Sequence, residues 1–182
     1  MARVQALAAI AAAVVTLMGS VAHAGEACGA ETHERFGETR AYFTDSLAAC
    51  RPDGYCSAVV TLPAREANGV MGNQLRIARP TSGAPYVLEL TAVSEEAAAT
   101  TKHVLRVGRR NHVLPLAEAG AVNAWAVSDQ AKTDAIVADL KAARFAFWRF
   151  QQPNGANAQT RFPLRGLTAA LAWVDCMGAN RN

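Results

Sequence analysis

The sequence predicts a mainly β protein, an antiparallel β-sandwich-like single domain with one or two helices near its C-terminus. In the first half, short segments of alternating apolar and polar residues are separated by turn residues, as is typical of antiparallel strands. In the second half, apolar residues recur at helical spacing in separate segments. No internal repeat and no linker divides the chain, so residues 25–182 are predicted to form one domain.

Residues 1–24 are interpreted as a secretory signal peptide that is cleaved before Gly25. Arg3 supplies the positive charge near its start, and an apolar run extends from Leu7 to Met18. Ala22-His23-Ala24 then satisfies the small-residue rule for cleavage. The apolar run is shorter than the roughly 20 residues that cross a membrane, and no later stretch is apolar enough. We therefore expect a periplasmic, extracellular or cell-surface protein without a transmembrane segment; an uncleaved anchor is the alternative.

The predicted strands of the first half are residues 42–50, 56–62, 75–79, 86–93, 104–107 and 112–114. The first two flank Pro52-Asp53-Gly54, a strong turn signal, and suggest a hairpin. In the fourth, Leu88 and Leu90 lie on one face and Glu89 on the other. Residues 80–85 are predicted to be a loop, residues 94–102 a loop or one helical turn, and residues 108–111 a hairpin tip.

The second half begins with a helix that has Ser128 as its predicted N-cap and Asp129 in its first turn, where a negative charge suits the helix dipole. A strand at residues 145–150 follows, with Phe145 and Phe147 on one side and Trp148 and Phe150 on the other. Such alternation usually places one side in the core and the other under a helix, and a binding platform is the alternative. A turn, a strand at residues 160–164 and a last helix complete the chain. That helix contains Leu167, Leu171 and Val174 and ends near Cys176.

All of the cysteines, Cys28, Cys50, Cys56 and Cys176, lie after the signal peptide. In an oxidising compartment four cysteines predict two disulfides, which can be paired in three ways. We favour Cys50–Cys56, because the turn between them brings the two positions together, and Cys28–Cys176, which would join the two ends of the domain. A zinc site is disfavoured, because the sequence has no C-x-x-C and its histidines do not cluster near the cysteines.

The C-terminal part contains residues 142–150 (AARFAFWRF), a polar turn and then residues 162–171 (FPLRGLTAAL). This part resembles the invasion-associated locus B family of exported proteins from Gram-negative bacteria. The family pattern is a helix, a strand, a turn and an apolar strand that runs into Ser-Leu-x-Gly-Phe/Leu-x-x-Ala. Residues 163–170 occupy that place here, with Pro163 instead of Ser.

The N-terminal part is similar as well. Residues 42–45 (YFTD) lead to Cys50 and then to Cys56 before a strand. A related exported family of unknown function shares this Phe-x-Asp-(Trp)-x-x-x-Cys opening and a Gly-Leu-x-Ala-Ala-Leu-x-Trp ending. This chain has Ser46 where that family tends to have Trp, and it keeps Trp173 at the end. The resemblance, which spans about residues 42–175, implies a β-sandwich-like domain, a periplasmic or surface location and no known catalytic residues. The role named for the family is assistance in host-cell invasion.

The net charge and the positions of the arginines indicate which class of partner the protein could bind. A net charge of +3 is too small for a nucleic-acid binder, so no nucleic acid is expected. The arginines of the predicted strands and turns are Arg76, Arg79, Arg106, Arg109 and Arg110. If Arg76 and Arg106 share the polar face of one sheet, these residues would form a cationic patch for an anionic glycolipid, a lipid headgroup surface, or an acidic envelope or host protein. Scattered arginines on a solvated face are the alternative.

The sequence predicts no catalytic residue and no cofactor, because it contains no nucleophile elbow, dinucleotide fingerprint, P-loop or H-E-x-x-H motif. His103 and His112 could face each other across neighbouring strands, but they lack a third ligand, so no metal site is predicted. We therefore expect a non-enzymatic binding or interaction protein of the cell envelope, of the invasion-associated type. A small periplasmic hydrolase whose residues converge only in the fold, and a purely structural envelope protein, are the alternatives.

Overall fold

A computed structural model of the chain describes residues 24–63, 71–93, 96–98, 102–118 and 123–180. The strands are β1 (Ala24–Ala27), β2 (Ala30–Arg35), β3 (Glu38–Phe43), β4 (Ser46–Cys50), β5 (Cys56–Pro63), β6 (Met71–Arg79), β7 (Val87–Thr91), β8 (His103–Val107), β9 (Arg110–Leu114), β10 (Leu116–Glu118), β11 (Ala124–Val127), β12 (Phe145–Gln151) and β13 (Asn157–Pro163). The helices are α1 (Gln130–Ala142) and α2 (Leu167–Ala179). Apart from Ala24, the predicted signal peptide lies outside the described residues.

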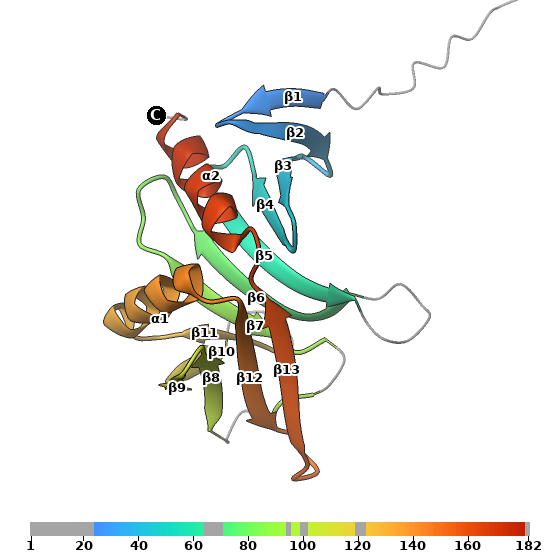
Figure 1. The fold of residues 1–182 in the computed structure, drawn as a ribbon, viewed down its shortest axis with the longest axis vertical. Coiled ribbons are helices and arrows are strands. Elements are labelled where there is room, and N and C mark those ends of the chain that lie inside the picture. Colours follow the sequence, from blue (N-terminus) through green and yellow to red (C-terminus); the bar gives the residue numbers. More distant parts are fainter. Residues whose placement is uncertain (1–23, 64–70, 94–95, 99–101, 119–122, 181–182) are drawn as a thin grey trace, which may run out of the picture.

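The strands form two antiparallel sheets (Figure 1). The large sheet has nine strands in the order β1-β2-β3-β4-β5-β6-β7-β11-β10, and the small sheet has four in the order β13-β12-β8-β9. The predicted fold class, mainly β with antiparallel sheets and helices, is confirmed. Among the described residues, neither helix combines the length and apolar character needed to cross a membrane.

The hairpin around Pro52-Asp53-Gly54 is formed by β4 and β5, as predicted. Cys50 and Cys56 are directly opposed in this hairpin, and their α-carbons lie 4.1 Å apart in the disulfide. The predicted strand at residues 42–50 is, however, divided into β3 and β4. The division occurs at Thr44, whose φ of 52° is incompatible with extended backbone and starts a tight turn.

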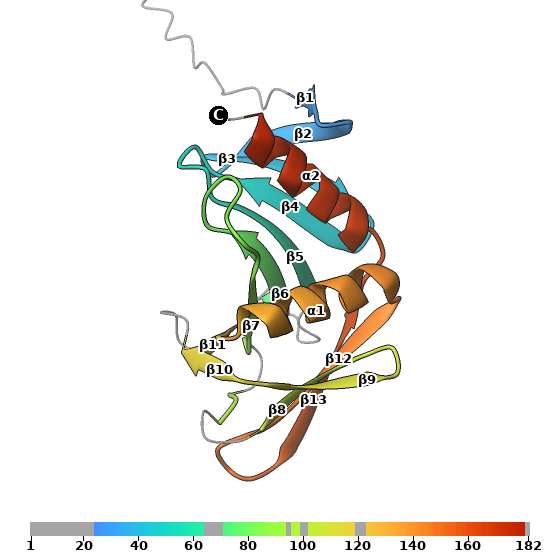
Figure 2. The same cartoon turned by 90° about the vertical axis from the view of Figure 1, so that its left-hand side faces the viewer.

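The helix α2 covers one face of the large sheet, over β3, β4 and β5 (Figures 1 and 2). Its N-terminal end and its sheet-facing side contribute Leu167, Leu171 and Val174 to the core, as the helical spacing predicted. Trp173 is also buried, and its indole Nε1 donates a hydrogen bond of 2.9 Å to the carbonyl of Ala27 in β1.

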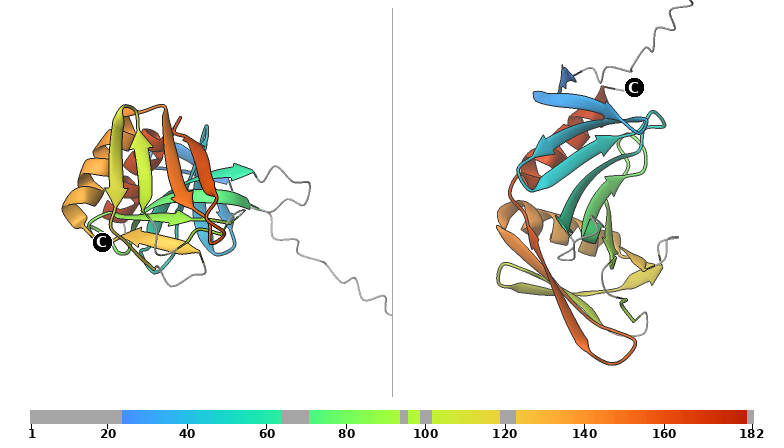
Figure 3. Two further views of the ribbon diagram at one scale, coloured as in Figure 1. Left: turned by 90° about the horizontal axis from the view of Figure 1, so that it is seen from below. Right: turned by 90° about the vertical axis from the view of Figure 1, so that its right-hand side faces the viewer.

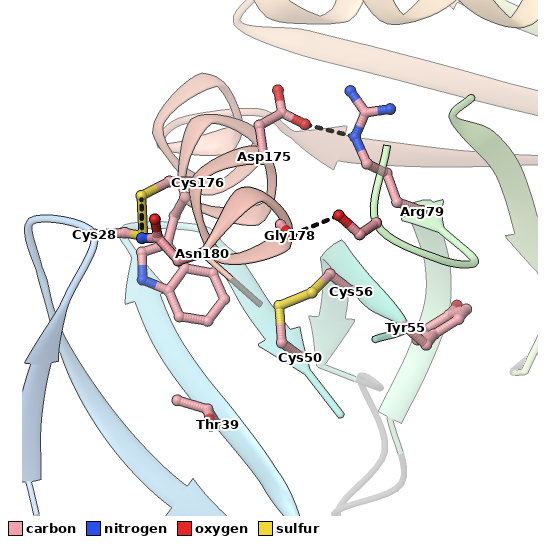
Figure 4. Close-up of a disulfide and its surroundings, with 12 residues drawn as sticks. Cys28, Thr39, Cys50, Tyr55, Cys56, Arg79, Asp175, Cys176, Gly178 and Asn180 are labelled. Atoms are coloured by element: carbon pink, nitrogen blue, oxygen red, sulfur yellow. Dashed lines mark hydrogen bonds and ion pairs between the residues drawn. A yellow bond between two sulfur atoms is a disulfide. The ribbon is translucent and has the colours of Figure 1, made fainter. Parts of the chain in front are cut away.

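The second disulfide joins the same helix to the start of the domain. Cys28, directly after β1, bonds to Cys176 in α2, with the α-carbons 5.9 Å apart (Figure 4). Both predicted disulfides are therefore present, and the described residues contain no free cysteine. The helix continues past Cys176 to Ala179, slightly beyond its predicted end.

The helix α1 lies between α2 and the small sheet in Figure 2, and it contacts β7, β8 and β11. Its N-cap is Asp129 and not Ser128. The Asp129 carboxylate accepts a hydrogen bond from the Lys132 amide at 3.0 Å, whereas the Ser128 amide and hydroxyl both donate to the carbonyl of Pro115. Because both polar groups of Ser128 bind Pro115, the helix is capped by Asp129 instead.

Aromatic side chains join the two sheets. Trp125 of β11 lies 6.2 Å, centre to centre, from Trp148 of β12, and Trp148 lies 4.4 Å from Phe150. All of these rings are buried, so they form the core between the sheets. The turn that joins β12 and β13 lies at the opposite end of the molecule from β1 and the C-terminus (Figures 1 and 3).

Four strands were not predicted: β1, β2, β10 and β11. In β2 only Thr32 is buried, so its sequence carries no apolar alternation. β1, β10 and β11 are each four residues or fewer, too short for a periodic pattern to be recognised. Conversely, β13 begins at Asn157, before the predicted start at residue 160, because its pairing with β12 continues through polar residues as far as Gln151.

Candidate functional site

The arginines predicted to form one cationic patch are divided between the two sheets. Arg76 and Arg79 lie in β6 of the large sheet, whereas Arg106 and Arg110 lie in β8 and β9 of the small sheet, with Arg109 in the turn between them. Arg76 and Arg106 therefore share neither a sheet nor a face. The structure does not assemble these five residues into one patch, and their binding of an anionic surface stays a prediction.

Several of these arginines already have an acidic partner. Arg76 Nη1 lies 3.9 Å from the Glu89 carboxylate, which is opposite it on β7. Arg110 Nη1 lies 2.9 Å from the Asp139 carboxylate in α1. Such partners offset the positive charge that an anionic ligand would otherwise meet.

Arg79 has a structural role, because it connects β6 to α2. Its Nε donates to the Asp175 carboxylate at 2.7 Å (Figure 4), and its guanidinium lies over the Tyr86 ring, 3.9 Å from the centroid. The Tyr86 hydroxyl donates to the same carboxylate at 2.6 Å. Burial and then the Asp175 carboxylate raise the pKa of Tyr86 to about 12, so this hydroxyl stays protonated and holds the helix in place.

The strands of the small sheet, by contrast, carry arginines and no acidic residues. Each of its strands carries one arginine, and none of them contains an Asp or a Glu. The arginines are Arg106, Arg110, Arg149 and Arg161. Because the whole chain has a net charge of only +3, the small sheet is a local concentration of positive charge. Two of its members, Arg149 and Arg161, were not predicted as site residues.

Cross-strand pairing shows which side chains share the solvent-exposed face of the small sheet, here called the outer face. Directly opposed residues of antiparallel strands lie on the same face. One row across the strands is Arg161, Phe147, Arg106 and Asn111, and the next row is Gln159, Arg149, Val104 and Val113. Phe145, Gln151 and Asn157 continue this face, whereas the alternate residues are buried. The outer face therefore holds three of the four arginines of the sheet, and Arg110 points to the other side, where Asp139 lies.

Guanidinium groups, and not a helix, lie over the Phe rings of the outer face. The Arg161 guanidinium carbon is 3.6 Å from the centre of the Phe145 ring, and that of Arg106 is 4.4 Å from the centre of the Phe147 ring. Both arginines are exposed, and within the described part of the chain neither forms an ion pair. Stacking on a ring occupies the flat face of a guanidinium and leaves the N–H groups at its edge free to donate.

The outer face also contains a groove, next to the β12–β13 turn. The groove has a volume of about 750 Å³. Its lining consists of Lys102, Val104, Arg149, Phe150, Gln151, Asn157, Ala158 and Gln159. Among the described residues, the lining thus combines two cations with three side-chain amides and includes no acidic residue.

His103 and His112 lie in neighbouring strands, β8 and β9, but their side chains have different contacts. His103 lies in the core between the sheets, 5.3 Å from the Trp125 ring, and its Nε2 is 3.2 Å from the Ala98 carbonyl. Burial lowers the pKa of His103, although the Ala98 carbonyl opposes this shift. His112 instead contacts the Asp139 carboxylate at 3.0 Å. Among the described residues, no group of three or more His, Cys, Asp or Glu side chains could hold a metal ion.

Comparison with known proteins supports the fold. No protein-family model and no curated protein sequence matches this chain. The crystal structure of invasion associated protein B from Bartonella henselae is similar, with a TM-score of 0.59 and 13% sequence identity, and the match covers 79% of this chain and 99% of that chain. At this identity the similarity shows a common fold. The two disulfides are consistent with an exported protein.

Proposed function

We propose that the chain is an exported, non-enzymatic binding protein of the cell envelope, and that the outer face of its small sheet binds an anionic partner. The observation that carries this proposal is the pair of exposed guanidiniums of Arg106 and Arg161, each stacked on a Phe ring and without an acidic partner among the described residues.

The chemistry of the pair suits anion binding. A guanidinium can donate two parallel hydrogen bonds to a carboxylate or phosphate, and such charge-assisted bonds are stronger than neutral ones. Because each group is held against a ring, less side-chain entropy is lost when a ligand binds. Arg106 and Arg161 both oppose Phe147 from the two sides of β12, so about 10 Å separates the two strands that carry them. A partner with several anionic groups, such as a glycolipid headgroup layer or an acidic protein surface, could contact both.

Export and an envelope location are supported by the predicted signal peptide, the disulfides and the fold shared with invasion associated protein B. A part in host-cell interaction rests on that fold and on the family resemblance alone. A non-enzymatic role is supported by titratable side chains that form hydrogen bonds between elements of the fold. His112 is held by Asp139, and Tyr86 by Asp175. A periplasmic hydrolase and a purely structural envelope protein are the competing functions.

The test compares two charge-neutralising variants of the protein purified after export. The double variant Arg106→Gln/Arg161→Gln removes the stacked pair. Arg51→Gln makes the same kind of change at an exposed arginine in the β4–β5 turn, outside the small sheet. Since a basic residue near an anionic surface contributes about 1 kcal/mol, the double variant should bind vesicles containing phosphatidylglycerol or lipopolysaccharide about 30-fold more weakly.

Binding of the wild type should also weaken with added salt, because the contact involves exposed charges. Arg51→Gln should bind like the wild type, and both variants should keep the melting temperature. A wild type that binds neither surface, or a double variant that binds like the wild type, contradicts the proposal. Hydrolysis of an envelope substrate would favour the competing enzyme.

A further inference from the structure

The groove of the outer face has a lining suited to a ligand that carries hydroxyl groups as well as negative charge. We infer that this groove binds an acidic carbohydrate, meaning a sugar with a carboxylate or phosphate group. The inference rests on the proposed anion-binding function and names the class of ligand for it.

The positions of the amides follow from the strand register. Gln151 is directly opposite Asn157, and Gln159 is directly opposite Arg149, in adjacent rows of the outer face. Opposed residues have β-carbons about 5 Å apart, and residues two apart along a strand are separated by about 7 Å. Three amides and one guanidinium therefore surround an area about the size of one sugar ring. Lys102, which precedes β8, lines the same groove.

Amides and cations select different parts of a ligand. A side-chain amide has both donors and an acceptor, so it matches hydroxyl groups, which also donate and accept. A simple phosphate or carboxylate offers only acceptors, and it would leave the amide oxygens without partners. The cations, in contrast, need an anionic group. Only a ligand with both features satisfies Lys102, Arg149 and the amides together.

The Arg149 guanidinium is positioned before any ligand binds. Its Nη2 donates to the Asn111 side-chain oxygen at 3.1 Å, across β8 in the next row. Asn111 is neutral, so the positive charge of Arg149 is retained. The remaining N–H groups of the guanidinium can therefore bind an anionic substituent.

The shape of the groove suits part of a longer glycan. Its volume of about 750 Å³ is within the range of roughly 300–1,000 Å³ that is typical of small-ligand sites. Val104, which shares a row of the outer face with Arg149, supplies apolar lining that the C–H face of a sugar could contact. The hairpin that carries the groove ends far from α2 and the C-terminus, so a polymer could approach it (Figure 3).

Calorimetric titration of the exported protein tests the inference with defined probes. Two acidic sugars are used, a trisaccharide of galacturonic acid for the carboxylate and glucose 6-phosphate for the phosphate. Maltotriose lacks the charge, inorganic phosphate lacks the ring, and a poly-glutamate peptide supplies the charge on a protein backbone. We expect at least one acidic sugar to bind at least 10-fold more tightly than all three comparison ligands.

The variant Gln151→Ala/Asn157→Ala/Gln159→Ala separates this inference from the proposed function. It should bind the acidic sugar at least 10-fold more weakly while binding phosphatidylglycerol vesicles, which are anionic but carry no sugar, like the wild type. Gln152→Ala, whose side chain is in the adjoining turn and does not line the groove, is the matched control and should change neither.

Failure of this inference can be distinguished from failure of the proposed function. The inference is wrong if neither acidic sugar binds, or if any of the three comparison ligands binds as tightly as the acidic sugars. It is also wrong if the amide variant binds the sugar like the wild type. The proposed function then stands or fails on the binding of the Arg106→Gln/Arg161→Gln variant to phosphatidylglycerol vesicles, since a surface without sugars does not test the amides.

Discussion

Gly166 lies so close to Phe43 that a β-carbon at position 166 would be 2.0 Å from the Phe43 carbonyl oxygen. Next to this contact, the Arg165 guanidinium donates to the Asp45 carboxylate at 2.7 Å and lowers its pKa. The Phe-x-Asp opening and the Gly-Leu-x-Ala-Ala-Leu ending, which together carry the family resemblance, are thus in direct contact. Their role is to fix the start of α2 on the turn between β3 and β4.

Substitution of Gly166 by Ala should destabilise the protein strongly. The residue has a φ of +83°, which is unfavourable for Ala, and the added methyl group would collide with backbone that cannot move independently. We expect a loss of about 3 kcal/mol in the free energy of unfolding, measured by urea denaturation. Gly155→Ala is the matched control, because Gly155 has the same φ of +83° but nothing within 4 Å, and it should cost only about 1 kcal/mol. Equal losses would show that the contact with Phe43 is unimportant.

The disulfide between Cys28 and Cys176 should contribute substantially to stability. It closes a loop with a sequence separation of 148, which constrains the unfolded chain strongly. Cys28→Ser and Cys176→Ser should each reduce the free energy of unfolding by roughly 2–5 kcal/mol, and the double variant by little more, because each change removes the same bond. Peptide mapping without reduction checks the pairing directly. Additive losses, or a peptide linking Cys28 to Cys50 or Cys56, would contradict this arrangement.

Stability should fall as the pH drops below about 6.5, because His103 is buried among aromatic rings. Burial lowers the pKa of His103 in the folded state, so the unfolded state binds more protons in this range and the free energy of unfolding rises with pH. The expected slope is at most about 1.4 kcal/mol per pH unit. His103→Leu should flatten the decline below about pH 6.5, whereas His33→Asn, at a partly exposed site in β2, should not. A His103→Leu profile parallel to the wild type would exclude this histidine as the cause.

Export should remove the segment before Gly25. Intact-mass measurement of protein from the periplasm should give a mass without Met1 to Ala24, because Ala22-His23-Ala24 meets the small-residue rule. Ala24→Arg should block cleavage at this position, whereas Ala27→Ser, which leaves the rule satisfied, should not. A wild-type mass that still includes the first segment would contradict the predicted processing.

The sequence by itself determined the local structure. The Pro52-Asp53-Gly54 turn fixed both a hairpin and one disulfide, and the helical spacing of Leu167, Leu171 and Val174 marked the buried side of α2. These signals are readable because turn geometry and side-chain periodicity depend on neighbouring residues only. With one local disulfide assigned, the remaining two cysteines had no other partner.

The tertiary structure alone decided which strands pair and which arginines lie together. Arg76 and Arg106 occupy similar alternating strands in the sequence, yet strand pairing places them in different sheets. Arg161 and Arg106, far apart in the chain, both oppose Phe147 and so share the outer face. Pairing of distant strands is set by burial of their apolar sides between the sheets, as for Trp125 and Trp148, and no short segment of sequence encodes it.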